Sequence, residues 1–332
     1  MKQRRVLVVT NMYPSDDAPA RGAFVLAQVR GLEEAGVETQ VVVLDGRRQK
    51  SVYWTARRRV ADASDRFRPD FVYAFYGLTG WVCLAQSAPV VLSLAGDDVL
   101  GTPKRVRDGI TIKSRVGMSI SQWAAMRSEV VCVQSEEMRR RLWTRALRKR
   151  AHVIPYGVDA TRFSPGDRVA ARHRIGVADG RKLVIFPNTP TEPRKRLDLA
   201  RSAVAVACAS VPDTELRIVN GVSHETMVDY YRAADCTLLT SDWEGSPNVV
   251  KESLCCGTPV VTTDVGDVQR WIPLTQSSAI VERTPESIGA ALIRVLRDPR
   301  REDPTPFVNG FSVSAVTHTV LSLADAATAE RR

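Results

Sequence analysis

Residues 5–44, RVLVVTNMYPSDDAPARGAFVLAQVRGLEEAGVETQVVVL, contain one strand, helix and strand in succession. RVLVVTN is apolar enough for a buried strand, and a polar loop with Pro14, Pro19 and Gly22 follows it. FVLAQVRGLEEAG then has the spacing of a helix, and TQVVVL is a second strand-like run. This order predicts a βαβ unit, in which a helix joins two parallel strands.

The same alternation extends along the rest of the chain. DFVYAFY, PVVLSLAG and EVVCVQS are strand-like runs separated by helical segments. A connector rich in Pro, Gly and Asp follows, HVIPYGVDATRFSPGD, and the pattern then begins again with KLVIFPN, ELRIVNG, CTLLTS and PVVTTD. Strands that alternate with helices in this way indicate parallel sheets covered on both faces. The sequence predicts an α/β fold class with two Rossmann-like, doubly wound parallel-sheet domains that face across a cleft.

The connector divides the chain into two domains. We place the N-terminal domain at residues 1–158 and the C-terminal domain at residues 159–310. Residues 311–332 form a predicted helix that caps the second domain or packs back on the first. Ligands of open parallel sheets bind beyond the carboxyl ends of the strands, so the loops after IFPN, IVNG and LLTS are the expected places for a site.

The composition indicates a globular protein with an anionic partner. Apolar residues make up 44% and charged residues 25% of the 332 residues, as in ordinary soluble domains. The net charge of +10 calls for a polyanion, an anionic membrane surface or an anionic small ligand. The apolar run Val6–Val9 is too short for a signal peptide, and no run approaches the ~20 apolar residues of a membrane span. We expect a cytoplasmic protein, or one that is peripheral on the cytosolic face of a membrane.

The six cysteines lie among apolar or small residues and lack the spacing of metal ligands. They are predicted to be buried thiols of a reducing compartment. The predicted ligand loops contain no Asp-x-Asp pair, so neither a metal site nor a cofactor is expected.

SDWEGSPNVVKESLCCGTPVV, residues 241–261, places two glutamates around a Gly-Ser-Pro-Asn turn where a strand gives way to a helix. The unpaired N–H groups of a first helical turn, together with the helix dipole, suit a phosphate. Gly245 lets the backbone approach a ligand, and Pro247 fits a first turn because its missing N–H would be unpaired there. The turn is therefore predicted to be an anion site.

The two carboxylates, Glu244 and Glu252, need a partner other than the phosphate, which would repel them. Sugar hydroxyls donate hydrogen bonds to carboxylate oxygens. A nucleotide sugar has hydroxyls on both sides of a phosphate bridge, since ribose, pyrophosphate and hexose follow one another in it. The alternative is that Glu244 is an exposed loop residue and Glu252 an ordinary helix glutamate.

EGSPNVVKE, followed by CGTPVVTTDVGDV, resembles the E-x7-E signature of family 4 glycosyltransferases, which are retaining enzymes of the GT-B fold. VLVVTNMYPSDDAPARGAFV is similar to the family's first strand and acceptor loop, VIPYGVDATRFSP to its interdomain segment, and PRKRLDLA to its basic donor loop. The resemblance covers most of the chain. It implies an enzyme that moves a sugar from a nucleotide sugar to an acceptor hydroxyl, in the synthesis of a surface polysaccharide or glycolipid.

The resemblance implies two catalytic residues in the C-terminal domain. Glu244 would contact the transferred sugar, and Lys195 would be the cation on the pyrophosphate. Glu252 would hold the ribose hydroxyls, and His224 lies where the family shapes the nucleobase pocket. The remaining donor-binding candidates are the turn residues Gly245, Ser246, Pro247 and Asn248, and Arg194 and Arg196, which compete with Lys195 for the phosphate.

In the N-terminal half the resemblance implies an acceptor side with four candidate residues, Arg21, Gly22, Asp97 and Asp98. The two aspartates either bond to an acceptor hydroxyl or are polar residues of a turn. The chain departs from the family pattern at two places. PNTPTEP lacks the arginine that many members carry before the lysine, and Ala95 stands where the family often has histidine.

The expected partners are a nucleotide sugar and a sugar or lipid-linked glycan acceptor. The basic segments TPKRVRDGITIKSRVGMSISQWAAMR and EEMRRRLWTRALRKR either lie on an anionic membrane surface or are ordinary helices with a solvated face. Two alternatives remain open for the function: a GT-B sugar-nucleotide epimerase, or a basic nucleic-acid-binding protein without catalysis. The chain has no helix-turn-helix, zinc or RNP-type motif, so nucleic acid is not an expected partner.

Overall fold

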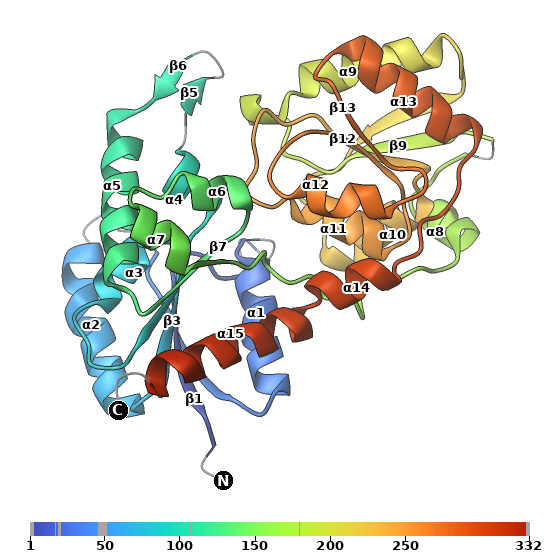
Figure 1. Ribbon diagram of the computed structural model, residues 1–332. Helices are drawn as coiled ribbons and strands as arrows, with labels where there is room; N and C mark the ends of the chain where they lie inside the picture. Colours follow the sequence, from blue (N-terminus) through green and yellow to red (C-terminus); the bar gives the residue numbers. More distant parts are fainter. Residues whose placement is uncertain are drawn as a thin grey trace. The chain divides into compact units, whose positions relative to one another are not determined.

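The structure, a computed structural model, describes residues 3–16, 18, 21–45, 52–101, 103–105, 108–178 and 180–329. The chain divides into two compact units (Figure 1). The first unit contains residues 1–157 and 313–332, and the second contains residues 158–312. The expected boundary after residue 158 lies one residue from this division, and the C-terminal helix belongs to the first unit.

The first unit is built on a six-stranded sheet. Its strands are β1 (Arg5–Thr10), β2 (Glu38–Val43), β3 (Phe71–Phe75), β4 (Val90–Ser93), β7 (Val130–Val133) and β8 (Ala151–Val153), in the order β2-β1-β3-β4-β7-β8. All neighbouring strands are parallel. The helices are α1 (Ala23–Glu34), α2 (Val52–Phe67), α3 (Gly77–Cys83), α4 (Gly96–Leu100), α5 (Ile112–Arg127), α6 (Glu136–Arg140), α7 (Arg145–Arg150) and α15 (Val313–Ala329). A separate hairpin joins β5 (Pro103–Arg105) and β6 (Asp108–Ile110).

Helices cover both faces of this sheet because its strands are apolar on both sides. In β1, Leu7 and Val9 belong to the hydrophobic cluster that includes residues of α2, α3 and α5. Val6 and Val8 belong to the cluster that includes residues of α1 and α15. Alternating side chains of one strand thus enter two different cores, as expected for a strand between two helical layers.

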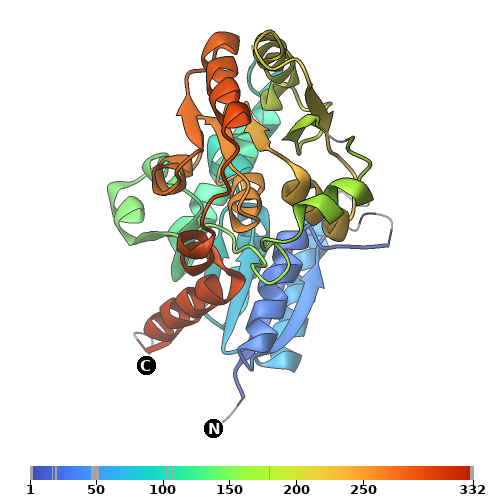
Figure 2. The same ribbon diagram turned by 90° about the vertical axis from the view of Figure 1, so that its right-hand side faces the viewer.

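The chain returns to the first unit through α15, which lies beside α1 (Figure 2). Gly31 of α1 allows this approach. A Cβ atom at Gly31 would lie 2.4 Å from Cγ1 of Val313 and 2.6 Å from Oγ1 of Thr317. Only glycine fits there without moving α15, so the close packing of these two helices depends on a residue without a side chain.

The second unit is built on a five-stranded sheet. Its strands are β9 (Lys182–Phe186), β10 (Thr214–Ile218), β11 (Cys236–Leu239), β12 (Val260–Thr263) and β13 (Ala279–Val281), in the order β10-β9-β11-β12-β13, and all are parallel. The helices are α8 (Arg168–Arg174), α9 (Leu197–Cys208), α10 (His224–Ala233), α11 (Asn248–Cys255), α12 (Val268–Trp271), α13 (Pro285–Arg297) and α14 (Thr305–Phe311). Two 3-10 turns are η1 (Pro193–Lys195) and η2 (Ile272–Leu274).

Each sheet reverses its strand order once, beside the first of its strands in the chain. In the first unit the reversal lies between β1 and β3, and in the second it lies between β9 and β11. At such a switch point the following loops diverge to opposite faces, which leaves a crevice at the carboxyl ends of the strands. Each unit therefore presents one topologically favoured place for a ligand.

The predicted fold class of two Rossmann-like parallel-sheet domains is confirmed. The six cysteines form no disulfide, and five of them are buried. Within the described segments, no helix combines the length and hydropathy required to cross a bilayer.

Candidate functional site

The loops after β9 and β11 meet at the switch point of the second sheet. The loop after β9 ends in η1, which contains Arg194 and Lys195, and the loop after β11 carries Glu244. Hydrogen bonds to two main-chain carbonyls join the two loops. The N–H of Asp242 donates to the carbonyl of Arg194 at 2.8 Å, and Oγ1 of Thr240 donates to the carbonyl of Lys195 at 2.9 Å. The basic turn is thus fixed against the acidic loop.

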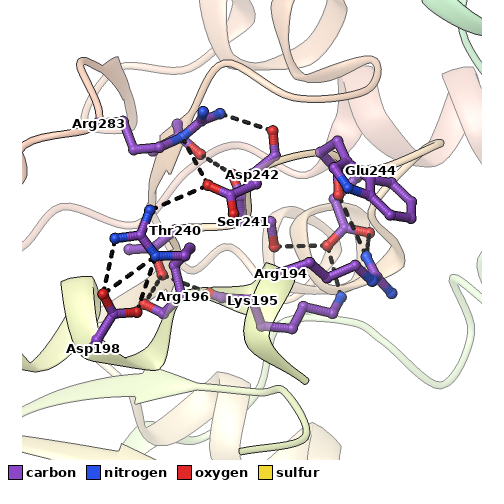
Figure 3. A network of polar contacts seen from close by, with 11 residues as sticks. Arg194, Lys195, Arg196, Asp198, Thr240, Ser241, Asp242, Glu244 and Arg283 are labelled. Carbon is purple, nitrogen blue, oxygen red and sulfur yellow. Dashed lines mark hydrogen bonds and ion pairs between the residues drawn. The ribbon is translucent and has the colours of Figure 1, made fainter. Parts of the chain in front are cut away.

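The buried carboxylate of Glu244 accepts three side-chain hydrogen bonds (Figure 3). Nζ of Lys195 donates to Oε1 at 2.7 Å, and Oγ of Ser241 donates to the same oxygen at 2.7 Å. Nη1 of Arg194 donates to Oε2 at 2.9 Å. The Arg194 guanidinium also stacks on the ring of Trp243 at 4.8 Å from the centroid. We call Arg194, Lys195, Ser241 and Glu244 the Glu244 network.

The two cations determine the charge of Glu244. Burial by itself raises the pKa of this carboxyl group, but the charges of Lys195 and Arg194 and the hydrogen bonds from Lys195 and Ser241 outweigh burial, and the pKa is lowered. Glu244 is therefore ionised at neutral pH. A ligand with its own negative charge could replace it as the partner of Lys195 and Arg194.

Arg196 is directed away from Glu244 (Figure 3). Its backbone is left-handed, with φ 54°, where it precedes α9. Its guanidinium donates to Oδ2 of Asp198 at 2.8 Å and to Oδ1 of Asp242 at 3.3 Å. Of the three consecutive basic candidates, Arg194 and Lys195 converge on Glu244 and Arg196 does not. Two cations thus lie at Glu244 although PNTPTEP, upstream of them, contains none.

The turn before α11 is supported by the loop after β12. Oγ of Ser246 donates to Oδ2 of Asp267 at 2.8 Å, and Nε1 of Trp271 donates to the same oxygen at 2.9 Å. Gly266, with φ 61°, packs against the turn, and a Cβ atom there would lie 2.8 Å from the carbonyl oxygen of Gly245. The hydroxyl of Ser246 therefore holds the turn in position.

The expected place of Pro247 is wrong by one residue. Helix α11 begins at Asn248, and Pro247 precedes it with φ −73° and ψ 107°. Proline fits this position as well, because its fixed φ suits the extended backbone at a helix start. The first N–H groups of α11 still point out of the amino end of the helix, as an anion site requires.

Glu252 lies further along α11, beside Tyr231 of α10. The Tyr231 hydroxyl donates to Oε2 of Glu252 at 2.8 Å. Burial raises the pKa of Glu252, although the hydrogen bond from Tyr231 and the charge of Lys251 oppose this change. His224, the first residue of α10, is half-buried, and its ring lies 5.9 Å from that of Phe163, which in turn lies 5.9 Å from Tyr231. His224 and Glu252 are thus linked through two aromatic rings.

Arg21 and Gly22 lie in the loop after β1. Arg21 forms a bidentate ion pair with Asp45, with both distances 3.2 Å, and donates to the carbonyl of Asn11 at 2.9 Å. Gly22 has φ 71°, and a Cβ atom there would lie 2.5 Å from the carbonyl of Met12. Gly22 allows the close turn of this loop, and Arg21 joins the loop to Asp45, which follows β2.

Asp97 and Asp98 lie in helix α4, so the alternative that placed them in a turn is wrong. Asp97 is exposed. Asp98 accepts hydrogen bonds from the N–H of Ala95 at 2.9 Å and from Oγ of Ser121 at 3.1 Å, and also from the N–H of Gly77. Burial raises the pKa of Asp98 to about 6. Asp98 therefore joins the starts of α3 and α4 to α5.

Sequence reasoning missed several residues that hold the site together. Ser241 is the second residue after the end of β11, at the edge where ligands bind, and that position was a usable signal. Tyr231 follows the buried Val228 by three residues on α10, which places both on the inward face. Asp267 lies in CGTPVVTTDVGDV and Trp243 stands directly before Glu244, but the sequence did not indicate their contacts with Ser246 and Arg194.

Across the part of the chain that the structure describes, no three His, Cys, Asp or Glu side chains are grouped to hold a metal ion.

Two protein families match the chain. Residues 3–157 match the family described as "Glycosyl transferase 4-like domain", and residues 212–307 match the one described as "Glycosyl transferases group 1". The first match lies within the first unit and the second within the second unit.

Two curated relatives are named as glycosyltransferases. The chain is 32% identical over 189 aligned positions to a D-inositol 3-phosphate glycosyltransferase of Geodermatophilus obscurus, which covers 46% of this chain and 41% of that protein. It is 24% identical over 353 aligned positions to a Bacillus subtilis (strain 168) protein provisionally named as the teichuronic acid biosynthesis glycosyltransferase TuaC, which covers 87% of this chain and 88% of that protein. The matched part spans less than half the length of the D-inositol 3-phosphate glycosyltransferases of Geodermatophilus obscurus, Thermobispora bispora and Nocardiopsis dassonvillei.

The fold is similar to that of Anabaena HepE, solved in complex with UDP. The TM-score is 0.67 at 13% identity, and the match covers 98% of this chain and 100% of that one. This likeness shows a shared fold. Because both families and both relatives are described as glycosyltransferases, the epimerase and nucleic-acid-binding alternatives are not favoured.

Proposed function

The chain belongs to the family 4-like glycosyltransferases of the GT-B fold, and on this premise we propose that it transfers a sugar from a nucleotide sugar to an acceptor hydroxyl with retention at the anomeric carbon. In this proposal the second unit binds the donor and the first unit carries the acceptor side. The acceptor is a sugar or a lipid-linked glycan, and the pathway builds a surface polysaccharide or glycolipid. The name of the TuaC relative, which spans most of the chain, supports this setting.

The convergence of Lys195 and Arg194 on Glu244 carries the proposal. Cleavage of a nucleotide sugar places negative charge on the departing diphosphate, and preorganised cations stabilise that charge. When the diphosphate takes the two cations, Glu244 becomes available to the hydroxyls of the transferred sugar. The amino end of α11 adds N–H donors for the same phosphates. Because the protein supplies these charges itself, we propose a reaction that needs no metal ion.

Glu252→Gln tests the donor half of the proposal. We expect the affinity for one of UDP, GDP, ADP or CMP to fall about 10- to 100-fold, because ribose hydroxyls lose a charged acceptor. Burial raises the pKa of Glu252, so the wild type should also lose affinity as the pH falls, at a higher pH than an ordinary glutamate would produce. Both affinities are measured by calorimetry from pH 5 to pH 8. The ratio of wild-type to variant affinity isolates the titration of Glu252, because protonation of the nucleotide phosphates affects both proteins equally.

Glu286→Gln is the matched control for this experiment. Glu286 is exposed in the first turn of α13, so nucleotide affinity should not change. An affinity ratio near one for Glu252→Gln at every pH would contradict the donor assignment.

We further propose that the enzyme works at the cytosolic face of an anionic membrane. Helix α5 supports this, because its large apolar side chains face outward: Ile112, Val116, Trp123 and Met126 are exposed, whereas the buried side chains include Ser121, Ala124 and Ala125. Lys113, Arg115 and Arg127 are exposed on the same helix, and Arg127 lies over the Trp123 ring at 4.7 Å. An apolar stripe with flanking cations fits an anionic lipid surface.

The membrane contact can be tested by co-sedimentation with phosphatidylglycerol vesicles. We expect the double variant Val116→Gln with Trp123→Gln to bind about tenfold more weakly than the wild type, since it loses two apolar side chains that enter the bilayer surface. Val169→Gln, at an exposed apolar residue of the second unit, should bind as the wild type does. Equal binding by the double variant would contradict this placement, as would binding to neutral phosphatidylcholine vesicles of the same strength.

A further inference from the structure

Tyr76 has a backbone conformation that side-chain-bearing residues rarely adopt. Its φ is 77° and its ψ is 147°. Among the residues that the structure describes, Arg68 and Arg196 are the other non-glycine residues with positive φ, and Arg196 lies in the ordinary left-handed region at φ 54° and ψ 52°. Tyr76 lies close to a region that is almost restricted to glycine, so its backbone is strained.

The surrounding main chain imposes this conformation. The N–H of Tyr76 donates to the carbonyl of Ser93 at 2.9 Å, which extends the pairing of β3 with β4. The carbonyl of Tyr76 accepts from the N–H of Gly80 at 3.0 Å and so begins α3. The next residue, Gly77, has no space for a side chain, since a Cβ atom would lie 2.0 Å from Oγ of Ser121. The chain must turn sharply at residue 76 whatever its side chain.

Glycine would make this turn without strain, yet the chain has tyrosine there. Strain of this kind persists mainly at functional sites, where the side chain has a use that outweighs the cost. The side chain of Tyr76 is therefore the feature that needs an explanation.

Tyr76 stands at the switch point of the first sheet. It follows β3 directly, beside the loop after β1, as the Glu244 network lies beside β9 and β11 in the second sheet. Tyr156, Asp98, Asp97 and Arg21 interact electrostatically with its phenol, and the last three were acceptor-side candidates from the sequence. Backbone strain and sheet topology thus point independently to the same residue.

The Tyr76 hydroxyl has a weak partner inside the protein. It donates to Sδ of Met12 at 3.7 Å, and a thioether is a poor hydrogen-bond acceptor. Burial raises the pKa of Tyr76, so the phenol is neutral and can both donate and accept. A ligand hydroxyl would be a better partner than the sulfur.

We propose that Tyr76 is an acceptor-binding residue, whose ring and hydroxyl contact a polyhydroxylated ring at the switch point of the first unit. This rests on the proposed transfer to an acceptor hydroxyl and names a residue that selects the acceptor. The aromatic ring packs against the C–H face of a sugar or cyclitol, and the phenol bonds to one of its hydroxyls. Phe24, whose ring lies 6.4 Å from that of Tyr76 in an edge-to-face arrangement, holds the ring in place.

The test compares two variants that each lose one phenolic hydroxyl, at positions 76 and 73. Tyr76→Phe keeps the ring and loses the hydroxyl, and Tyr73→Phe does the same at a buried residue within β3. Binding of methyl α-D-glucopyranoside, methyl α-D-mannopyranoside and myo-inositol is measured on the full chain by saturation-transfer NMR. Nucleotide affinity is measured by calorimetry on the same samples.

We expect the wild type to bind at least one of the three probes and Tyr76→Phe to bind it about tenfold more weakly. Tyr73→Phe should bind the probe as the wild type does, and all three proteins should bind the nucleotide equally. Unchanged probe binding in Tyr76→Phe, or an equal loss in Tyr73→Phe, overturns the assignment. A wild type that binds nucleotide but none of the probes overturns the role of Tyr76 alone, whereas one that binds neither overturns the proposed function as well.

Discussion

Glu244→Gln is expected to reduce turnover about 10²- to 10³-fold while strengthening the binding of a nucleoside diphosphate. The variant keeps the shape of the side chain and removes its charge. In the proposed reaction that charge acts on the transferred sugar, and losing one preorganised electrostatic contact of this kind typically costs this much. Lys195 and Arg194, which the carboxylate holds at 2.7 Å and 2.9 Å, would then be released to the phosphates.

Steady-state kinetics and calorimetry on the same preparation check both halves of this expectation. Asp242→Asn is the matched control, because Asp242 lies on the same loop but pairs with Arg196 and Arg283. That variant should retain turnover. If Glu244→Gln keeps its turnover and binds nucleotide more weakly, Glu244 serves only to support the loop.

Lys195→Met is expected to weaken the binding of a nucleoside diphosphate about 10- to 100-fold and to leave binding of the corresponding nucleoside unchanged. The lost ammonium contacts phosphate in this proposal, and a nucleoside has none. The variant should also be less stable, because Glu244 is buried and loses one of its two cationic partners. Calorimetry with UDP and uridine, or with the matching pair for another base, separates the phosphate contribution from the rest.

The neighbouring arginines provide the comparison for Lys195→Met. Arg194→Gln should weaken diphosphate binding about tenfold, whereas Arg196→Gln should have little effect, since Arg196 pairs with Asp198 and Asp242. The double variant Lys195→Met with Glu244→Gln should recover stability but not turnover. Equal losses of affinity for Arg196→Gln and Lys195→Met would show that all three cations form one diffuse positive patch.

The alternation of apolar runs and helical segments was sufficient to predict the fold. A strand such as β3, buried at every position, can only lie in the middle of a sheet with helices on both faces. The start of α11 was also readable, because Gly-Ser-Pro-Asn before a helical pattern is typical of a helix start. These features follow from local spacing and backbone preference, which a single chain displays directly.

The sequence by itself determined the fold class, the place of the two glutamates around the turn before α11, and the presence of three consecutive basic residues in the loop after β9. It did not determine which cation meets Glu244, because Arg194, Lys195 and Arg196 are consecutive and chemically alike. That choice depends on the left-handed backbone at Arg196, which turns its side chain toward Asp198, and on Trp243, against which Arg194 stacks. Only the tertiary structure sets these, since they arise where two loops from separate strands meet.

On the acceptor side, the sequence indicated even less about which side chains matter. No sequence motif indicated Tyr76, because backbone strain is a property of φ and ψ and not of residue type. Its turn is imposed by Ser93 on the neighbouring strand and by Ser121 on α5, which are 17 and 45 residues away in the chain. Local pattern determined what each segment of this protein is, and long-range packing decided which side chains face one another at the ends of its strands.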